Sequence, residues 1–478
     1  MKRYVEGENR HQAVLFPERL DDYIGEDNPV RVVDAFVEEL NLQKLGFQRA
    51  EAAVTGRPGY HPATLLKLYI YGYLNRIPSS RRLERESQRN IELMWLTGRL
   101  SPDFKTIADF RKDNGAAVQK VCAQFVALCR QIGVFSKSLV AVDGSKFKAV
   151  NNTDKNFNPR KIQMRIEQVT KRVARYLAEL DRADRQADAV PEARVSHLRE
   201  RIAAARKTLQ WLDTMDEQVT SAPDGQVSLT DPDARSMATS GKGTATVGYN
   251  VQTAVDTEHH LIVAHEVTNI GNDRSQLAPM AAKAKAAMGL DSPTVLADRG
   301  YFNGPQILEC EAQDMIPVVP KPMTSNATAA GRFDKRDFTY QADDDTFICP
   351  AGERAIFRFE SIEKGQKQRK YWSSACPGCA LKARCTTSAY RRITRWEHEA
   401  VLDAMQAWLD RMPQASRIRR RTVEHPFGTL KAWMGATHFT TRTMPKVRTE
   451  MSFYILAYNI KRMIGLMGAA SLIQAMQA

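Results

Sequence analysis

SLVAVDGSKFKAV, residues 138–150, marks the point at which a helical sequence pattern gives way to a strand pattern. A short run rich in β-branched residues is typical of a buried strand. Asp143 lies near the middle or end of that run, where a buried carboxylate is costly unless it has a partner. The stretch therefore predicts a buried strand whose acid requires a cation.

Four later segments share this pattern, and one of them carries a second acid. Asp298, like Asp143, follows an apolar run and precedes a turn that contains glycine. Together with the first strand, the four segments predict a five-stranded sheet. They are TATVGYNVQTAVD (244–256), HLIVAHEVTN (260–269), PTVLADRGYF (293–302) and IPVVPKP (316–322).

Length and charge bound the class of protein. A chain of 478 residues exceeds the size at which one core keeps growing, so several domains are expected. Its net charge of +14 favours a polyanionic partner, with nucleic acid first, while a basic protein without such a partner stays open. The N-terminal residues 1–16 lack a signal-like apolar run, and no stretch approaches a membrane span. We expect a cytoplasmic protein with no membrane partner.

The region before the first strand is helical. From about Asn28 to Val134 apolar residues recur three and four positions apart, which predicts a helical domain over residues 1–135. Its cations are candidates for contacts to DNA phosphates, and an ordinary solvated face is the competing interpretation. These candidates are Arg81, Arg82, Arg85, Lys105, Arg111 and Lys112.

A charged insertion, residues 161–219, separates the first two strands. Apolar residues recur at alternating three- and four-residue steps on both sides of Pro191. This spacing is typical of an antiparallel, coiled-coil-like helical hairpin. Two interpretations stay open: an arm for dimerisation or DNA positioning, and an arm that packs only on its own core.

The cysteines fall into two groups. Cys122, Cys129 and Cys310 lie in apolar surroundings, which predicts buried thiols. The other four lie in a basic, aromatic-rich segment, residues 326–395, and their spacing matches a tetrahedral structural Zn²⁺ site of the zinc-ribbon type. Disulfides and free thiols are the alternatives, and a DNA contact by this segment is a further hypothesis. The four are Cys349, Cys376, Cys379 and Cys385.

A third acid, Glu424, lies in RIRRRTVEHPFGTLKAWMG, residues 417–435. A plain surface ion pair there would contribute little, and Lys431 is seven residues on, hence on the same helical face. Pro426 removes one backbone hydrogen bond, so a helix is expected to begin close to Glu424 or to kink there. Two rival acids exist: Asp256, expected in a hairpin turn, and Asp273, expected to cap a helix.

A metal site would explain the three acids. If Asp143, Asp298 and Glu424 lie within about 4 Å, their mutual repulsion is about 4 kcal/mol per pair at an effective dielectric near 20. Two Mg²⁺ ions, for which Mn²⁺ is the expected substitute, would remove this repulsion and support in-line displacement at phosphorus. The neighbouring cations would neutralise the phosphates of the cut strand: Arg417, Arg419, Arg420, Arg421 and Lys431.

The motifs together resemble a known family. VAVDGSKFKA, GYNVQTAVD, ADRGYFNG and RTVEHPFGTLK look like the signature blocks of bacterial insertion-sequence transposases of the DDE type, nearest to the insertion-sequence family numbered eleven eighty-two. Residues 56–114 are similar to the helical domain that precedes the catalytic core in this group. By this resemblance Asp143, Asp298 and Glu424 take the places of the metal-binding triad, and Arg420 and Lys431 those of the group's Arg and Lys.

The resemblance implies a multi-domain α/β protein. Its ribonuclease H-like catalytic core, a five-stranded mixed sheet with helices, would comprise residues 136–160, 220–325 and 396–470, interrupted by the helical hairpin and the cysteine-rich insertion. Water would first cut at an element end, and the freed 3′-hydroxyl would then attack target DNA by transesterification. The implied partners are double-stranded DNA, namely the terminal inverted repeats and the target, and a second copy in a homodimer on DNA. The implied location is the bacterial nucleoid. A domesticated, non-catalytic DNA-binding protein and a metal-dependent nuclease without strand joining are the alternatives.

Overall fold

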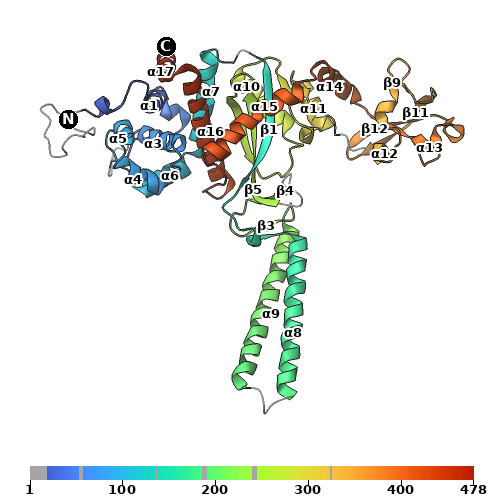
Figure 1. Ribbon diagram of the computed structural model, residues 1–478, viewed down its shortest axis with the longest axis horizontal. Coiled ribbons are helices and arrows are strands. Elements are labelled where there is room, and N and C mark those ends of the chain that lie inside the picture. Colours follow the sequence, from blue (N-terminus) through green and yellow to red (C-terminus); the bar gives the residue numbers. More distant parts are fainter. Residues whose placement is uncertain (1–18, 53–57, 136, 186–190, 239–244, 323–325) are drawn as a thin grey trace, which may run out of the picture.

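The structure is a computed structural model that describes residues 19–52, 58–135, 137–185, 191–238, 245–322 and 326–478. The N-terminal residues 1–16 therefore lie outside the described part. Figure 1 shows a helical region at the N-terminal side, a central sheet covered by helices, a long two-helix arm and a small β-rich unit at the far end. None of the described helices is both long and apolar enough to cross a membrane.

The central sheet is mixed and has the order β4-β5-β1-β7-β8, with β6 also paired to β5. β1 pairs antiparallel with β5 and parallel with β7, so it is the strand at which the sheet changes direction. This mixed α/β arrangement is consistent with a ribonuclease H-like transposase core. Its strands are β1 (Leu139–Lys148), β4 (Arg235–Ala238), β5 (Ala245–Asp256), β6 (Ile262–Thr268), β7 (Thr294–Leu296) and β8 (Ile316–Val318).

The five predicted strands are all present, and β4 is a sixth that the sequence pattern does not predict. β4 is four residues long and pairs antiparallel with the start of β5, while β6 pairs with a later part of the same edge. Such a short segment has too few residues to show an alternating pattern. Among the described residues, the central sheet therefore has six strands, one more than the sequence predicts.

Both faces of β1 are buried, which explains its apolar run. Val140 and Val142 contribute to a core formed with α10 (Leu277–Met288) and α11 (Gly304–Ala312). Ala141 contributes to the core on the other face, where α15 (Ala415–Gly428) packs against β1. Because side chains alternate along a strand, Asp143 follows Ala141 onto the α15 side.

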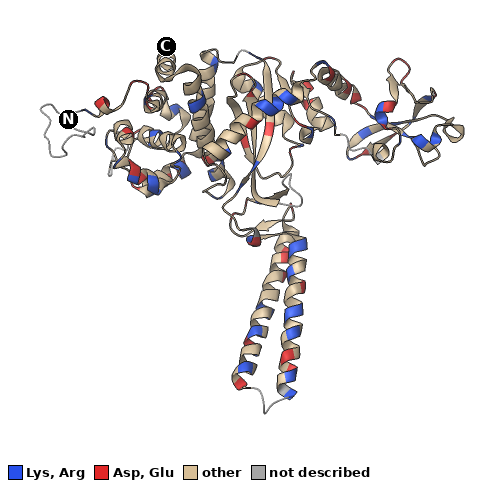
Figure 2. Cartoon of the chain, in the orientation of Figure 1, with Lys and Arg blue, Asp and Glu red and all other residues tan. Residues whose placement is uncertain are grey.

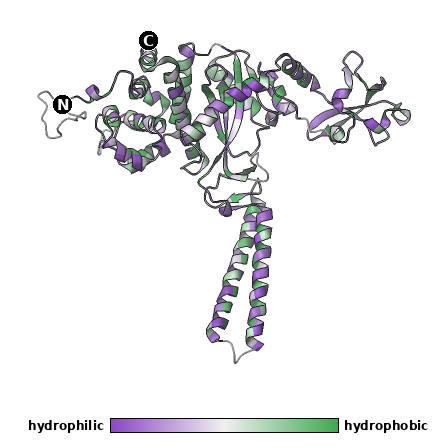
Figure 3. Ribbon diagram, in the orientation of Figure 1, coloured by the Kyte–Doolittle hydropathy of each residue, from purple (hydrophilic) through white to green (hydrophobic). Residues whose placement is uncertain are grey.

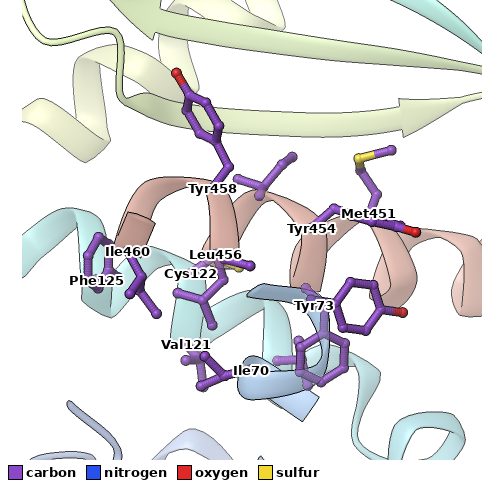
Figure 4. Close-up of a cluster of buried hydrophobic side chains, with 14 of the residues drawn as sticks. Ile70, Tyr73, Val121, Cys122, Phe125, Met451, Tyr454, Leu456, Tyr458 and Ile460 are labelled. Carbon is purple, nitrogen blue, oxygen red and sulfur yellow. The ribbon is translucent and has the colours of Figure 1, made fainter. Parts of the chain in front are cut away.

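α16 (Met444–Met467) joins the helical region to the sheet. It is buried nearly all round, as expected of a helix surrounded by other elements. Tyr69 and Tyr73 of α3 (Pro62–Leu74) stack on Phe453 of α16, with ring centroids 4.9 and 5.3 Å apart. Figure 4 shows α16 with Tyr73 on one side and Tyr458 directed to the other. The helical region and the sheet therefore share one hydrophobic core.

The helical region contains most of the remaining N-terminal elements. α17 at the C-terminus packs against α1, which brings the two ends of the chain's described part together. α7 packs on α16 and links the region to β1. The helices are η1 (Leu20–Tyr23), α1 (Pro29–Glu38), α2 (Leu42–Leu45), α4 (Ser80–Ser87), α5 (Ile91–Thr97), α6 (Phe104–Asp113), α7 (Gly115–Gln131) and α17 (Ala469–Gln477).

Two long helices, α8 (Pro159–Arg185) and α9 (Glu192–Ser221), fill the segment after β1 and form the arm in Figure 1. They pack on each other through Ile162, Val169 and Leu212. Hydrophilic and hydrophobic positions alternate along the arm in Figure 3, and Figure 2 shows Lys and Arg along both helices. Short strands β2 (Asn156–Phe157) and β3 (Val227–Ser228) pair at its base.

A second, antiparallel sheet occupies the segment between β8 and α14 (Glu399–Arg411). Its order is β13-β12-β11-β10-β9, and its small core includes Phe347 and Tyr371. The strands are β9 (Thr339–Gln341), β10 (Thr346–Ile348), β11 (Arg354–Glu363), β12 (Gln366–Trp372) and β13 (Ile393–Trp396). Short helices accompany them: α12 (Asn326–Ala329), η4 (Lys335–Asp337), η5 (Cys376–Gly378) and α13 (Lys382–Cys385).

Two helical glycines test the packing of the shared core. A Cβ at Gly72 would lie 2.7 Å from the Ile77 carbonyl oxygen, so Gly72→Ala is expected to lower the free energy of unfolding by about 1–3 kcal/mol. At Gly465 of α16 the nearest described atoms leave open space, so Gly465→Ala should raise it by about 0.5–1 kcal/mol. Urea denaturation measures both. Changes of the same sign would contradict the packing.

Candidate active site

The sheet brings Asp143 and Asp298 to one edge. β1 and β7 are parallel neighbours with Ala141 opposite Leu296. Asp143 lies two residues beyond Ala141, and Asp298 lies two residues beyond Leu296. Asp298 therefore follows the end of β7, and Asp143 lies at the matching level within β1, which continues to Lys148.

Arg419 lies between the two acids. Its Nη2 is 2.6 Å from Asp143 Oδ1 and 3.7 Å from Asp298 Oδ2. Arg419 faces the sheet because Val423, one helical turn later on α15, is buried in the core. Its Nε has no hydrogen-bond partner among the described residues. The sequence places Arg419 among the phosphate contacts, whereas the structure places its guanidinium in an internal ion pair.

The charge balance at Asp143 is incomplete. Burial raises the pKa of Asp143 to about 6; the Arg419 guanidinium opposes this effect, and the charge of Asp298 adds to it. The Gly144 backbone N–H donates to Asp143 Oδ1 at 2.9 Å. The raised pKa means that the one arginine does not fully stabilise the ionised form of Asp143 beside Asp298.

Lys431 also reaches β1. Its Nζ donates to Ser145 Oγ at 2.6 Å and to the Lys146 carbonyl oxygen at 3.1 Å, and it lies 4.7 Å from the Phe147 ring centroid. Burial lowers the pKa of Lys431, and the charge of Asp143 opposes that shift. The predicted lysine therefore lies beside the strand that carries the first acid.

Glu424 is placed differently from the two aspartates. Its side chain is exposed and forms no hydrogen bond or ion pair within the described part of the chain. Across the described ranges, no three His, Cys, Asp or Glu side chains are arranged to hold a metal ion. Asp143 and Asp298 nevertheless converge on one cation, and paired carboxylate oxygens are the donors that Mg²⁺ takes. The structure thus brings together two of the three predicted acids.

Two alternatives were expected from Pro426, a helix start close to Glu424 or a kink there, and the structure contradicts the first. α15 begins at Ala415, nine residues before Glu424, so a helix start close to Glu424 is wrong. Pro426 lies inside the helix, where it cannot donate to the carbonyl one turn earlier. The helix then continues as a π-helical turn, η6 (Thr429–Trp433), which carries Lys431.

Asp273 belongs to the site, although the sequence predicts a helix cap. It accepts hydrogen bonds from Asn250 Nδ2 and Gln252 Nε2, both at 2.7 Å, and Lys146 Nζ lies 3.4 Å away. α10 begins at Leu277 without a side-chain cap, so the expectation is wrong. The signal for this contact was the pair of buried amides two residues apart in an apolar strand. The other rival, Asp256, accepts from the Glu258 and His259 backbone N–H groups in the predicted turn.

The side chains of Asn250, Gln252 and Asp273 surround Gly144, the residue after Asp143. A Cβ at Gly144 would lie 2.7 Å from Asp273 Oδ1 and would overlap the Gln252 amide. Tyr301 donates to Gln252 Oε1 at 2.5 Å. Burial raises the pKa of Tyr301 well above its usual value, so the hydroxyl stays a neutral donor. Position 144 therefore requires glycine, because any side chain there would collide with this network.

The predicted DNA-contacting cations divide into exposed and internal groups. Arg111 donates to Tyr73 Oη at 3.2 Å and lies over the Tyr69 ring, so it packs inside the helical region. Lys112 is exposed, and its Nζ lies 3.6 Å from Asp113 Oδ1. The remaining predicted cations are exposed: Arg81, Arg82, Arg85 and Lys105 in the helical region, and Arg417, Arg420 and Arg421 on α15.

The cysteines divide as predicted into buried and clustered groups. Cys122, Cys129 and Cys310 are buried, and all seven thiols are free, which excludes disulfides in this structure. The four clustered cysteines are half-buried and line one small apolar cavity with Phe338 and Ile393. Burial raises the pKa of Cys385, and the other three thiols of the cluster add to that effect.

Two family profiles match the chain. Residues 18–113 match a transposase domain, DUF772, and residues 214–460 match the transposase DDE domain. The second match includes Asp298 and Glu424, whereas Asp143 precedes it and is assigned by its place in the sheet. No curated protein matches. A cryo-EM structure of a piggyBac transposase synaptic complex with hairpin DNA is similar over 94% of this chain and 79% of that chain, at 8% identity and a TM-score of 0.30, which is too low to carry an argument.

The raised pKa of Asp143 makes stability depend on pH. The shift from 3.8 to about 6 means that the folded chain binds more protons than the unfolded chain between these values. Stability from protonated Asp143 is therefore present at low pH and is lost as pH rises through 6. Asp143→Asn, which keeps the group neutral, should raise the free energy of unfolding near neutral pH by about 2–3 kcal/mol.

Chemical denaturation in a chelating buffer measures this effect at two pH values. The advantage of Asp143→Asn should disappear near pH 4, below about which the parent carboxyl is protonated in both states. Asp291→Asn, at an exposed position, controls for general effects of charge removal. An advantage of equal size at both pH values would contradict the assignment.

Proposed function

This chain belongs to the transposase DDE domain family and is therefore a DNA transposase; we propose that it cleaves the ends of a mobile element by metal-dependent hydrolysis and joins the 3′-hydroxyl to target DNA by transesterification. The signature blocks support a place among bacterial insertion-sequence enzymes, in the family numbered eleven eighty-two. The observation that carries the reaction is the convergence of Asp143 and Asp298 on Arg419.

The cofactor is a pair of divalent cations, Mg²⁺ or Mn²⁺ in its place. Asp143, Asp298 and Glu424 are the residues that would hold them, and the donor chemistry of the two converged aspartates fits this role. When bound, such ions lower the pKa of an attacking water and stabilise the attacking and leaving oxygens at phosphorus. Glu424 lies on the helix that already contacts β1 through Lys431, which supports its membership of the site.

The cations around the site orient the DNA. Lys431 is held between Ser145 and Phe147, so its ammonium group has a fixed position beside Asp143. Arg420 and Arg417 project from the same helix into solvent, where they would contact phosphates on the strand to be cut. These residues bind and position the backbone, because phosphate contacts fix the register of a protein on DNA without reading its sequence.

The other parts of the chain supply further DNA contacts in this proposal. The helical region, proposed as residues 1–135, presents the exposed cations Arg81, Arg82, Arg85 and Lys105. The catalytic core would comprise residues 136–160, 220–325 and 396–470, with the arm and the β-rich unit as insertions. The partners are double-stranded DNA of the element ends and the target, and a second copy in a homodimer on DNA.

Substitution of the acids tests the reaction. Asp143→Asn, Asp298→Asn and Glu424→Gln should each abolish Mg²⁺-dependent cleavage of element-end DNA, because each removes a charged ligand while nearly preserving shape. DNA binding should survive, since affinity comes from Lys and Arg and the acids act on the reaction barrier. Gel analysis of a labelled end fragment measures cleavage, and anisotropy measures binding.

The control is an acid outside the site. Asp256→Asn removes a carboxylate that serves a hairpin turn and should retain cleavage. Asp273→Asn is not a neutral control, because Asp273 contacts the network beside Asp143. Cleavage by Asp298→Asn at the parental rate would remove the second ligand from the proposal.

The clustered cysteines are proposed to hold structural zinc. Their spacing and their position around one apolar cavity support this assignment. Cys376→Ser should lower both the zinc content and the melting temperature, because a bound structural metal contributes to folding. Elemental analysis of the purified chain should find about one zinc per chain.

The buried thiol Cys122 is the matched control, and its replacement by serine should leave the zinc content unchanged. Zinc-free parent protein that melts like Cys376→Ser would instead mean that the four residues are ordinary thiols.

A further inference from the structure

Two cations lie close to the ring of Trp433. The Arg76 guanidinium carbon lies 4.8 Å from the ring centroid, and the Lys461 Nζ lies 3.5 Å from it. The three residues come from separate elements: the turn after α3, the end of η6 and α16. Trp433 is 43% exposed, and both cations are also exposed. The group is therefore open to solvent at the junction of the helical region and the core.

The two positive charges have no acid to balance them. Neither Arg76 nor Lys461 lies within ion-pair distance of an Asp or Glu among the residues that the structure describes. Arg31 over Trp95 shows the contrast, because Asp21 accepts from Arg31 Nη2 at 2.8 Å and from the Trp95 indole at 2.9 Å. The cation at Trp95 is neutralised by an acid, whereas among the described residues no acid neutralises the two cations at Trp433.

The backbone at Arg76 supports a functional requirement for its side chain. Its φ of 60° is left-handed, a conformation that costs residues other than glycine about 1–2 kcal/mol. The position follows the end of α3, where glycine is usual. Arg49 and Arg99 also have positive φ, so this conformation supports the argument without carrying it.

The group is close in sequence to the active-site lysine. Trp433 lies two residues after Lys431 in the same π-helical turn, and Lys431 donates to Ser145, two residues after Asp143. The ring is therefore carried by the same short turn as the lysine that reaches β1. Arg76 follows α3 and Lys461 lies on α16, two helices that pack on each other in the shared core.

We propose that Arg76, Trp433 and Lys461 form a binding site for a phosphodiester group of DNA. Two cations that contact one aromatic ring and have no acidic partner among the described residues supply the charge that a phosphate needs, and contact with the ring orders both side chains before binding. The charge of +14 makes DNA, a polyanion, the matching ligand. This inference rests on the proposed function, because the anion is taken to be DNA. Arg76 lies in the first matched domain and Trp433 in the second, and Lys461 directly follows the second match.

The test uses the full chain, a duplex of random sequence and no divalent metal, because phosphate contacts do not depend on sequence. Anisotropy is measured from low to high salt. Arg76→Gln with Lys461→Gln should reduce the salt slope by about 0.9, the value for one phosphate, and weaken binding about tenfold at moderate salt. Each single variant should show most of this loss, since both cations serve the same phosphate.

Arg31→Gln is the matched control. It removes the Arg31 cation beside Trp95. Because Asp21 already balances the charge of Arg31, the salt slope should stay at the parental value. Trp433→Leu should weaken binding with the slope nearly retained, because the cations remain but lose their order, and Trp433→Phe should restore affinity. A ring that only packs would instead lower the melting temperature and leave binding unchanged.

Three results would overturn the inference. A double variant with the parental slope and affinity would remove the phosphate site and leave the proposed function intact. A double variant that changes the oligomeric state by light scattering, with the slope unchanged, would show that the cations meet an acidic surface of a second copy. A parent protein whose binding ignores salt would overturn both this site and the proposed function.

Discussion

A guanidinium held between two carboxylates is the interaction on which the active site depends. Arg419 ties Asp143 of β1 and Asp298 after β7 to α15, three elements that are far apart in the sequence. Without a cation, two acids at the same level of neighbouring strands would repel each other. The parallel pairing of β1 and β7 places the acids, and the helix supplies the charge that lets them stay close. Every other contact of the site is built around this arrangement.

α16 gives the site its fixed surroundings. The stacking of Tyr69 and Tyr73 on Phe453 makes the helical region and the sheet one packed unit. An interior of this kind does not deform continuously. The helices that carry the predicted DNA-contacting cations and the strands that carry the acids therefore keep their relative positions.

Much of the sheet and part of the site could be predicted from the sequence. Strand runs buried on both faces are visible as apolar segments, and Asp143 and Asp298 stand out because acids are costly there. β4 was too short to show a period. The sequence named Asp273 only as a rival acid and a helix cap, because its partners, Asn250 and Gln252, lie on β5, and the pattern of one segment cannot reveal a contact with another. Two buried amide side chains in an otherwise apolar strand are the sequence signal that indicates a polar partner from another segment.

The arginine run before Glu424 shows how a helix divides one motif between two tasks. Successive residues on a helix point about 100° apart, so neighbouring arginines cannot all face the same partner. Arg419 turns inward because Val423 and Thr422, one turn later, are buried, and its guanidinium meets the acids. Arg420 and Arg421 turn outward and stay unpaired within the described ranges. A basic run that looks uniform in the sequence therefore contains one arginine that neutralises the acids of the site and others that are exposed to solvent. The direction in which each residue points from the helix determines its role.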